Sequence, residues 1–277
     1  MRDFTLTIYK YLLNTLRERG YPFYRVDRAP EPDGAPFIIL RHDVDRSPQN
    51  ALRMAGMEAD LGIRSSYYFR AVARSFDESV IREISRMNHE VGYHYENLAY
   101  IARGRRLGQF ADGGSPEDIY RQALEDFKKN LEKFRQSAPV KTICMHGSPM
   151  SRYDGRDLWK KYDYRDFGIE REPYFDFDFS KIFYMTDTGR RWDGDRVSVR
   201  DRVDVKGKKW PVYRTSLDII SAVKAGTFPG QAMITVHPQR WTNHPVSWMK
   251  ELIWQNSKNA VKRFFIWRRE KCLNQGE

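Results

Sequence analysis

The chain is predicted to fold as a parallel (β/α) barrel of the distorted, TIM-like kind, because three features of its sequence agree. Short β-rich runs alternate with amphipathic helical patterns along most of the 277 residues. No glycine-rich phosphate loop follows the first buried run, which disfavours a doubly wound dinucleotide-binding fold. Histidines and aspartates stand at the ends of several predicted strands, and in a barrel these ends all point to one functional face.

The expected elements follow in order along the chain. An N-terminal helix is predicted over residues 3–19, where apolar residues recur at helical spacing and Gly20 follows as a stop. The segment from Ser115 to Asp118 has the pattern of a capping box and opens a long helix. A second terminal helix, basic and aromatic, is predicted over residues 246–271, and both terminal helices are expected to pack on the barrel. Apolar runs predict buried strands at residues 37–40, 66–69, 90–93, 141–145, 182–185 and 233–236.

The composition limits the partners and the compartment. Forty-eight Lys and Arg against 37 Asp and Glu give a formal charge of +11, which attracts anionic partners or serves solubility alone. No nucleic-acid-binding motif accompanies this charge, so nucleic acid is not an expected partner. Two cysteines without metal-knuckle spacing, and an N-terminus without a secretory apolar core, predict a reduced, cytoplasmic setting.

Membrane contact is expected to be weak at most. No apolar run approaches the roughly 18 residues of a transmembrane helix. The C-terminal helix interleaves Trp and Phe with Lys and Arg, a composition that can lie on an anionic membrane surface. The alternative is that this helix docks on the barrel and exposes its basic face. The oligomeric state is left open by the sequence.

Reactive side chains gather at predicted strand ends. Four of the six histidines, His42, His94, His146 and His237, follow a strand, and Asp43 and Asp45 come just after the first strand. In a parallel barrel these side chains would converge although they are far apart in the chain. Histidine and carboxylate ligands together suit zinc or another divalent first-row ion, and a catalytic site of this kind keeps one position open for water.

The motifs around these residues resemble those of the polysaccharide deacetylases, the NodB-homology or carbohydrate esterase family four group. Arg-His-Asp-Val-Asp at 41–45 is similar to the first motif of that family, and His-Glu-Val-Gly-Tyr-His at 89–94 to its second. Met-His-Gly-Ser-Pro at 145–149 stands where the third motif is expected, and Val-His-Pro at 236–238 is similar to a late motif. More narrowly, the chain resembles deacetylase-like proteins of bacterial O-antigen and capsule gene clusters. The runs that carry this likeness are Arg-His-Asp-Val-Asp at 41–45, Gly-Tyr-His-Tyr-Glu at 92–96, Thr-Asp-Thr-Gly-Arg at 186–190 and His-Pro-Gln-Arg-Trp at 237–241.

The resemblance implies a role for each matching residue. Asp43 would be the general base, Asp45 and His94 would bind the metal, and His237 would be the general acid. The family pattern places a second metal-binding histidine four residues after the first, where this chain has Leu98. The candidates for the missing ligand are His146, Glu96 and His237. His146 is preferred, since it should project from a neighbouring strand end.

Two loops are expected to bind the sugar. Trp192 and Trp241 could stack on a sugar ring, while Arg190 and Arg240 could hold a phosphate or carboxylate. The alternative for all four residues is packing within their loops.

Together these observations predict one polysaccharide-deacetylase-like domain over residues 1–277. Its expected activity is metal-dependent hydrolysis of an N-acyl group, acetyl first, from an amino sugar during bacterial surface-polysaccharide biosynthesis. The substrate would be an amino sugar or a polysaccharide precursor. The alternative is a barrel that has lost catalysis, through Leu98, and binds an acidic glycan or nucleotide sugar.

Overall fold

A single parallel sheet forms the centre of the protein. The computed structural model describes residues 2–107, 115–148, 151–193 and 203–273. Within these ranges every strand pair is parallel, and the sheet has the order β5-β4-β3-β2-β7-β6, with β1 beside β2. The prediction of a parallel β/α barrel-type fold is confirmed, with β5 and β6 as the edge strands in the part of the chain that is described. The strands are β1 (Phe23–Tyr24), β2 (Phe37–Val44), β3 (Ser66–Phe69), β4 (Glu90–Tyr95), β5 (Ile143–Met145), β6 (Phe183–Thr186) and β7 (Gln231–Val236).

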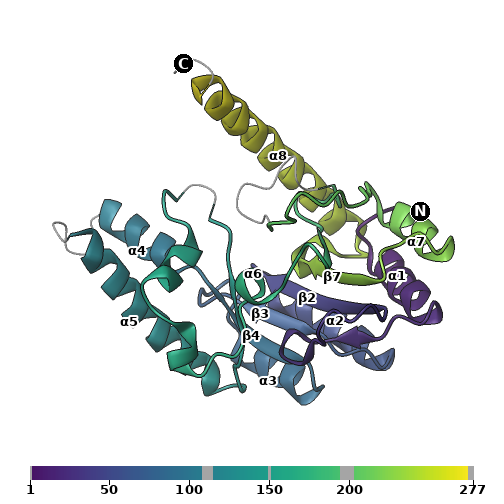
Figure 1. Ribbon diagram of the computed structural model, residues 1–277, viewed down its shortest axis with the longest axis horizontal. Coiled ribbons are helices and arrows are strands. Elements are labelled where there is room, and N and C mark those ends of the chain that lie inside the picture. The colour runs from purple at the N-terminus through teal and green to yellow at the C-terminus, as the bar shows by residue number, and fades with distance from the viewer. Residues whose placement is uncertain (1, 108–114, 149–150, 194–202, 274–277) are drawn as a thin grey trace.

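Helices connect the strands and cover the outer face of the sheet (Figure 1). In the view of Figure 1, α4 and α5 lie on the left of the sheet and α1 and α7 on the right. Helix α1 begins after Thr5, whose side chain accepts a hydrogen bond from the backbone of Ile8, so it is shorter than predicted. The capping box predicted at Ser115 and Asp118 is confirmed. The helices are α1 (Leu6–Glu18), α2 (Pro48–Asp60), α3 (Glu78–Arg86), α4 (Asn97–Arg106), α5 (Pro116–Arg135), α6 (Pro173–Asp176), α7 (Ser216–Lys224) and α8 (Pro245–Leu273).

Strand β2 is central, and all eight of its residues are buried. Its alternate side chains point to opposite faces, as in any strand. Ile38 and Leu40 pack among the helices α1 and α7, while Phe37 and Ile39 belong to a separate cluster inside the barrel. By the same alternation, Arg41 and Asp43 lie on the face of Phe37 and Ile39, inside the barrel, and His42 lies on the opposite face.

Helix α8 leaves the body of the protein toward the C-terminus (Figure 1). Its first half is anchored: Gln255 and Asn259 are buried, and Asn259 donates a hydrogen bond to the carbonyl of Gly189. The expected membrane contact involves Trp248, Trp254 and Lys258 together with aromatic and basic residues after residue 260, whose side chains lie outside the described part. None of the helices described is both long and apolar enough to cross a membrane.

Candidate active site

Five residues predicted to form the site converge at the carboxyl ends of the strands. Asp43 is the last residue but one of β2 and Asp45 follows that strand, His94 is in β4, His146 follows β5, and His237 follows β7. The Nε2 atom of His94 lies 3.7 Å from Asp43 and 3.7 Å from Asp45. The structure therefore brings these five residues together, and their roles stay a prediction.

Asp45, His94 and His146 form a group that could hold a metal ion. Oδ1 of Asp45 lies 3.4 Å from Nε2 of His146 and 3.7 Å from Nε2 of His94. Ligands roughly 2.0–2.2 Å from a tetrahedral zinc ion lie about 3.3–3.6 Å from one another, close to the spacing found here. Among the described residues, this buried Oδ1 atom has no hydrogen-bond partner, as expected for an oxygen that binds a cation.

The other nitrogen of each histidine is held by the protein. Nδ1 of His94 bonds to the carbonyl oxygen of Cys144 at 2.9 Å, and Nδ1 of His146 lies 3.2 Å from the Glu96 carboxylate. Such partners fix the ring and present Nε2 to a metal. Burial, aided by His146, lowers the pKa of His94 to about 4, so this ring is neutral near pH 7 and able to act as a ligand.

Glu96 therefore supports His146 instead of replacing it. Its carboxylate also pairs with Arg70. Burial alone would raise the pKa of Glu96, but its hydrogen bond to His146 and its pairing with Arg70 lower it to about 2. Leu98, which stands in place of the expected histidine, is fully buried in the apolar cluster beneath α4. That position faces the core, and the second imidazole of the candidate group is that of His146, directly after β5.

Asp43 is held in the ionised state by its neighbour on the same strand. The guanidinium of Arg41 donates to both carboxylate oxygens, at 2.8 Å and 2.6 Å. Burial alone would raise the pKa of Asp43, but Arg41, with His94 and His237, lowers it to about 2. Asp43 is thus a fixed, charged carboxylate beside the metal-binding group, which is the position a general base requires.

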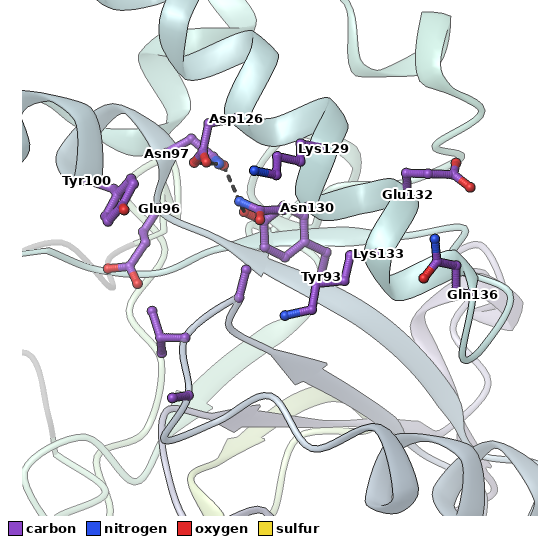
Figure 2. Close-up of a pocket in the computed structure, with 13 residues that line it drawn as sticks. Tyr93, Glu96, Asn97, Tyr100, Asp126, Lys129, Asn130, Glu132, Lys133 and Gln136 are labelled. Carbon is purple, nitrogen blue, oxygen red and sulfur yellow. Dashed lines mark hydrogen bonds between the residues drawn. The ribbon is translucent and has the colours of Figure 1, made fainter. Parts of the chain in front are cut away.

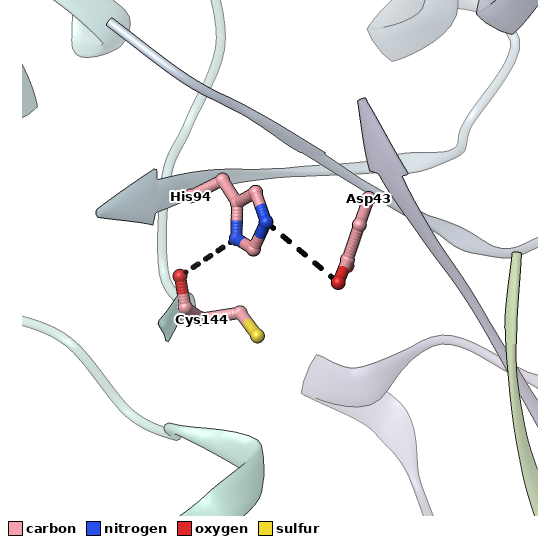
Figure 3. Close-up of side chains that lie close together, drawn as sticks. All are labelled: Asp43, His94 and Cys144. Atoms are coloured by element: carbon pink, nitrogen blue, oxygen red, sulfur yellow. Dashed lines mark hydrogen bonds and ion pairs between the residues drawn. The ribbon is translucent and has the colours of Figure 1, made fainter. Parts of the chain in front are cut away.

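Cys144 lies beside the same histidine and gives a second group of metal-ligand type with Asp43 and His94 (Figure 3). The two groups share His94, so they could not both be filled. Asp43 is already bound through both oxygens to Arg41, whereas Oδ1 of Asp45 is free of hydrogen bonds in the described structure. These contacts favour the group that contains Asp45 and His146.

His237 is oriented by an aspartate for which the sequence analysis gave no role. Its Nδ1 atom lies 2.6 Å from Oδ1 of Asp187, and its backbone N–H donates to Oδ2 of the same carboxylate. Arg240 and Trp241 donate to this carboxylate as well. Because Nδ1 is engaged, Nε2 is the nitrogen available for proton transfer. Asp187 directly follows β6, so the strand-end rule that selected the histidines would have found it.

His42 does not join the site, contrary to expectation. Strand β2 runs on to Val44, so His42 points to the face opposite Asp43 and lies among the helices. There its Nε2 atom is 2.9 Å from Oε1 of Glu58, and its Nδ1 atom is 3.2 Å from the carbonyl oxygen of Ser66. The hydroxyl of Tyr9 lies 3.0 Å from the same Nε2 atom, so His42 belongs to a buried polar cluster on the helical side of the sheet.

The predicted sugar platform is wrong. The rings of Trp192 and Trp241 are only 5% and 1% exposed and pack against Phe4. A ring covered in this way cannot stack on a sugar. Arg190 is also buried, bonded to the backbone of Trp248 and lying over the rings of Phe4 and Trp248.

Arg240 is the remaining member of that set, and it is buried too. One of its terminal nitrogens donates to both the carbonyl and the carboxylate of Asp187. The guanidinium therefore holds Asp187, and through it His237, in place of a substrate phosphate.

A pocket of about 790 Å³ lies between α4 and α5, and Glu96 is part of its lining (Figure 2). Its polar side chains already bond to one another: Asn97 donates to Asp126, and Tyr93 donates to Asn97. Burial raises the pKa of Asp126. Since both oxygens of Glu96 are engaged by Arg70 and His146, this pocket is separated from the metal-binding group by an occupied carboxylate.

Comparison with known proteins assigns no family to this chain. The sequence matches no protein-family model and no curated protein. The structure is similar to a CE4 esterase from Streptococcus mutans, at 13% identity and a TM-score of 0.43, over 91% of both chains. It is also similar to a CE4 family pseudoenzyme from Bacillus anthracis, at 14% identity and a TM-score of 0.40, over 91% of this chain and 76% of that one.

A mutant CE4 family pseudoenzyme with restored enzymatic activity gives 14% identity and a TM-score of 0.40 over 83% of this chain. The chain spans only 64% of the length of that protein. Likeness at these scores assigns no activity.

Proposed function

We propose that the protein is a metal-dependent amide hydrolase that removes an N-acyl group, acetyl first, from an amino sugar. The observation that carries this proposal is the Asp45, His94 and His146 group, with its near-tetrahedral spacing and the unpartnered Oδ1 atom of Asp45. A divalent ion held there, zinc by preference, would lower the pKa of a water molecule and polarise the acyl carbonyl. The resemblance of the sequence motifs to polysaccharide deacetylases supports the same reaction class.

The remaining residues supply the proton transfers. Asp43, ionised and fixed by Arg41, would take a proton from the attacking water. His237, fixed through Nδ1 by Asp187, would give a proton from Nε2 to the leaving amine. A base and an acid contributed by separate strands on the same face suit hydrolysis of an amide, whose nitrogen must be protonated before it leaves. A role in surface-polysaccharide biosynthesis fits an amino-sugar substrate and is part of the proposal.

The deciding experiment is metal content per chain in freshly purified protein, together with release of acetate from N-acetylated amino sugars. We expect about one zinc or similar ion in the wild type and almost none in Asp45→Ala or His94→Ala. Asp43→Asn should keep the metal and lose the activity, which separates the base from the ligands. A wild type that takes up no divalent ion would refute the hydrolase and favour a non-catalytic barrel that binds an acidic glycan or nucleotide sugar.

A further inference from the structure

A second cavity opens beside the candidate metal site. It is a groove of about 690 Å³ between the start of α2, the turn at Pro238–Arg240 and the first half of α8. Unlike the pocket near Glu96, it is connected to the metal-binding group by a side chain with an unused hydrogen-bonding atom. The residues of its lining that matter here are Arg46, Asn50, Arg53, Gln239, Lys250 and Trp254.

Gln239 makes the connection. Its Nε2 atom donates to Oδ2 of Asp45 at 3.1 Å, so the carboxylate fixes which end of the amide is nitrogen. Gln239 is only 9% exposed, and its Oε1 atom is buried without a hydrogen-bond partner among the described residues. A buried acceptor without a donor points to a ligand that supplies one. A sugar hydroxyl or an amide N–H bound beside Asp45 would do so.

The groove is also cationic. Arg53 and Lys250 are exposed in it, and Arg46 pairs with Glu251, the acidic residue of the lining. Helix α2 begins at this point, and Ser47 makes no capping hydrogen bond there through its side chain. The uncapped helix start adds partial positive charge from backbone N–H groups. The lining thus contains three cationic side chains and the start of a helix, while its one acidic residue is already paired. Such a surface is suited to binding an anion.

An aromatic ring borders the cationic residues. Trp254 of α8 is 52% exposed, and Nζ of Lys258 lies 5.1 Å from the centre of its ring. An exposed tryptophan beside a cationic groove can cover a flat or apolar group attached to an anion.

We infer that this groove binds a phosphate group attached to the amino sugar. The inference rests on the proposed function and deepens it, because it makes the substrate a phosphorylated or diphosphate-linked N-acyl amino sugar and excludes a neutral polymer. The sugar would meet Gln239 beside Asp45, and the phosphate would meet Arg53 and Lys250. Trp254 would contact the group beyond the phosphate. Nucleotide-linked and lipid-linked sugars share this chemistry.

Calorimetric binding to the full-length, metal-loaded protein tests the inference. The ligands are uridine-diphosphate-linked N-acetylglucosamine, a short-chain prenyl-diphosphate-linked N-acetylglucosamine in detergent, and free N-acetylglucosamine. The test variant is Arg53→Gln with Lys250→Gln. The control is Arg86→Gln with Lys128→Gln, two exposed cations on α3 and α5, away from the groove.

We expect the wild type to bind a diphosphate-linked sugar roughly tenfold or more tighter than the free sugar. The test variant should lose that advantage without weaker binding of the free sugar, and the control should keep it. The diphosphate ligand that binds more tightly identifies the source, nucleotide or lipid. Equal binding of free and diphosphate-linked sugars, or an advantage that survives in the test variant, would overturn the inference.

The two proposals fail separately. Metal-dependent release of acetate from a neutral amino sugar, with no preference for diphosphate, would keep the hydrolase and overturn the phosphate groove. Tight, variant-sensitive binding of a diphosphate sugar without hydrolysis would support the groove and overturn the hydrolase.

Discussion

Oδ1 of Asp45 and Nε2 of His146 face each other across 3.4 Å, one from the end of β2 and the other from the end of β5. These strands are separated in the sheet by β3 and β4, so the contact requires the ends of four neighbouring strands to converge. The pairing also shows how a chain with Leu98 in place of a histidine still presents two imidazoles and one carboxylate.

Glu96→Gln should weaken metal binding while leaving the three ligands in place. The substitution removes the charge that holds Nδ1 of His146, and loss of such a partner reduces metal affinity by about 10–100-fold. Competition with a coloured zinc chelator measures the change. Glu125→Gln, an exposed acid on α5, is the control and should retain wild-type affinity. Equal affinities in Glu96→Gln and wild type would argue against His146 as a ligand.

Asp187→Asn should reduce hydrolysis without loss of metal. An amide at this position cannot accept the Nδ1 proton of His237 as a carboxylate does, so the acid loses its orientation and its charge partner. We expect the rate of acetate release to fall by roughly 10²–10⁴-fold, the usual contribution of a positioned acid. Metal analysis should give the wild-type content. Asp166→Asn, on an exposed face, should change neither quantity.

Glu58→Gln should destabilise the protein and change its response to acid. Burial alone would raise the pKa of Glu58, but its neighbours, of which His42 has the largest effect, lower it to about 2. Since the folded value is below the unfolded one, the stabilisation is fully present above about pH 4.5 and is lost as the pH falls toward 2. The pKa difference corresponds to about 3 kcal/mol.

Urea unfolding at a series of pH values checks this prediction. At pH 7 the variant should lose about 3–5 kcal/mol, because the substitution removes a buried carboxylate to which His42, Tyr9 and Ser65 are bonded. Between pH 4.5 and 2 the gap between wild type and variant should shrink. A gap that stays constant through this range would show that Glu58 is not ionised in the folded protein.

Gly92→Ala should destabilise the barrel through crowding. A Cβ atom at this position would lie 2.3 Å from the ring of Tyr68 and 3.0 Å from the carbonyl oxygen of Thr142. Both neighbours are buried, so we expect a loss of about 1–3 kcal/mol in unfolding free energy. Gly56→Ala is the matched control: it sits in α2 with open space around its Cβ position and should be neutral or stabilising by up to about 1 kcal/mol. Thermal denaturation of the two variants makes the comparison.

Much of this structure was predictable because it depends on local patterns. The run at residues 37–40 gave the position of β2, and the strand-end rule located Asp43, Asp45, His94, His146 and His237. The strand was predicted too short because Arg41, His42 and Asp43 are polar, and hydropathy does not show that each is buried with a charged partner. The assignment of His42 to the site followed from that error.

The tryptophans were misinterpreted for a different reason. Trp192 and Trp241 stand in loops next to basic residues, where an exposed ring is a reasonable expectation. Their burial depends on Phe4, which reaches them from the other end of the chain. No local pattern in the sequence reports a contact of that range. Gln239 and Trp254 likewise become candidates only when α8 is placed beside the start of α2.

Strand β2 carries charge on both of its faces, with Arg41 and Asp43 toward the site and His42 toward Glu58. A single inserted or deleted residue early in the strand would move every later side chain to the opposite face. The carboxylate would then enter the helical layer, and the imidazole would occupy the place of the base. This segment can therefore diverge by substitution but not by change of length. Transplanting the site into another scaffold would require the strand together with α2, which supplies the counter-charge on its hidden side.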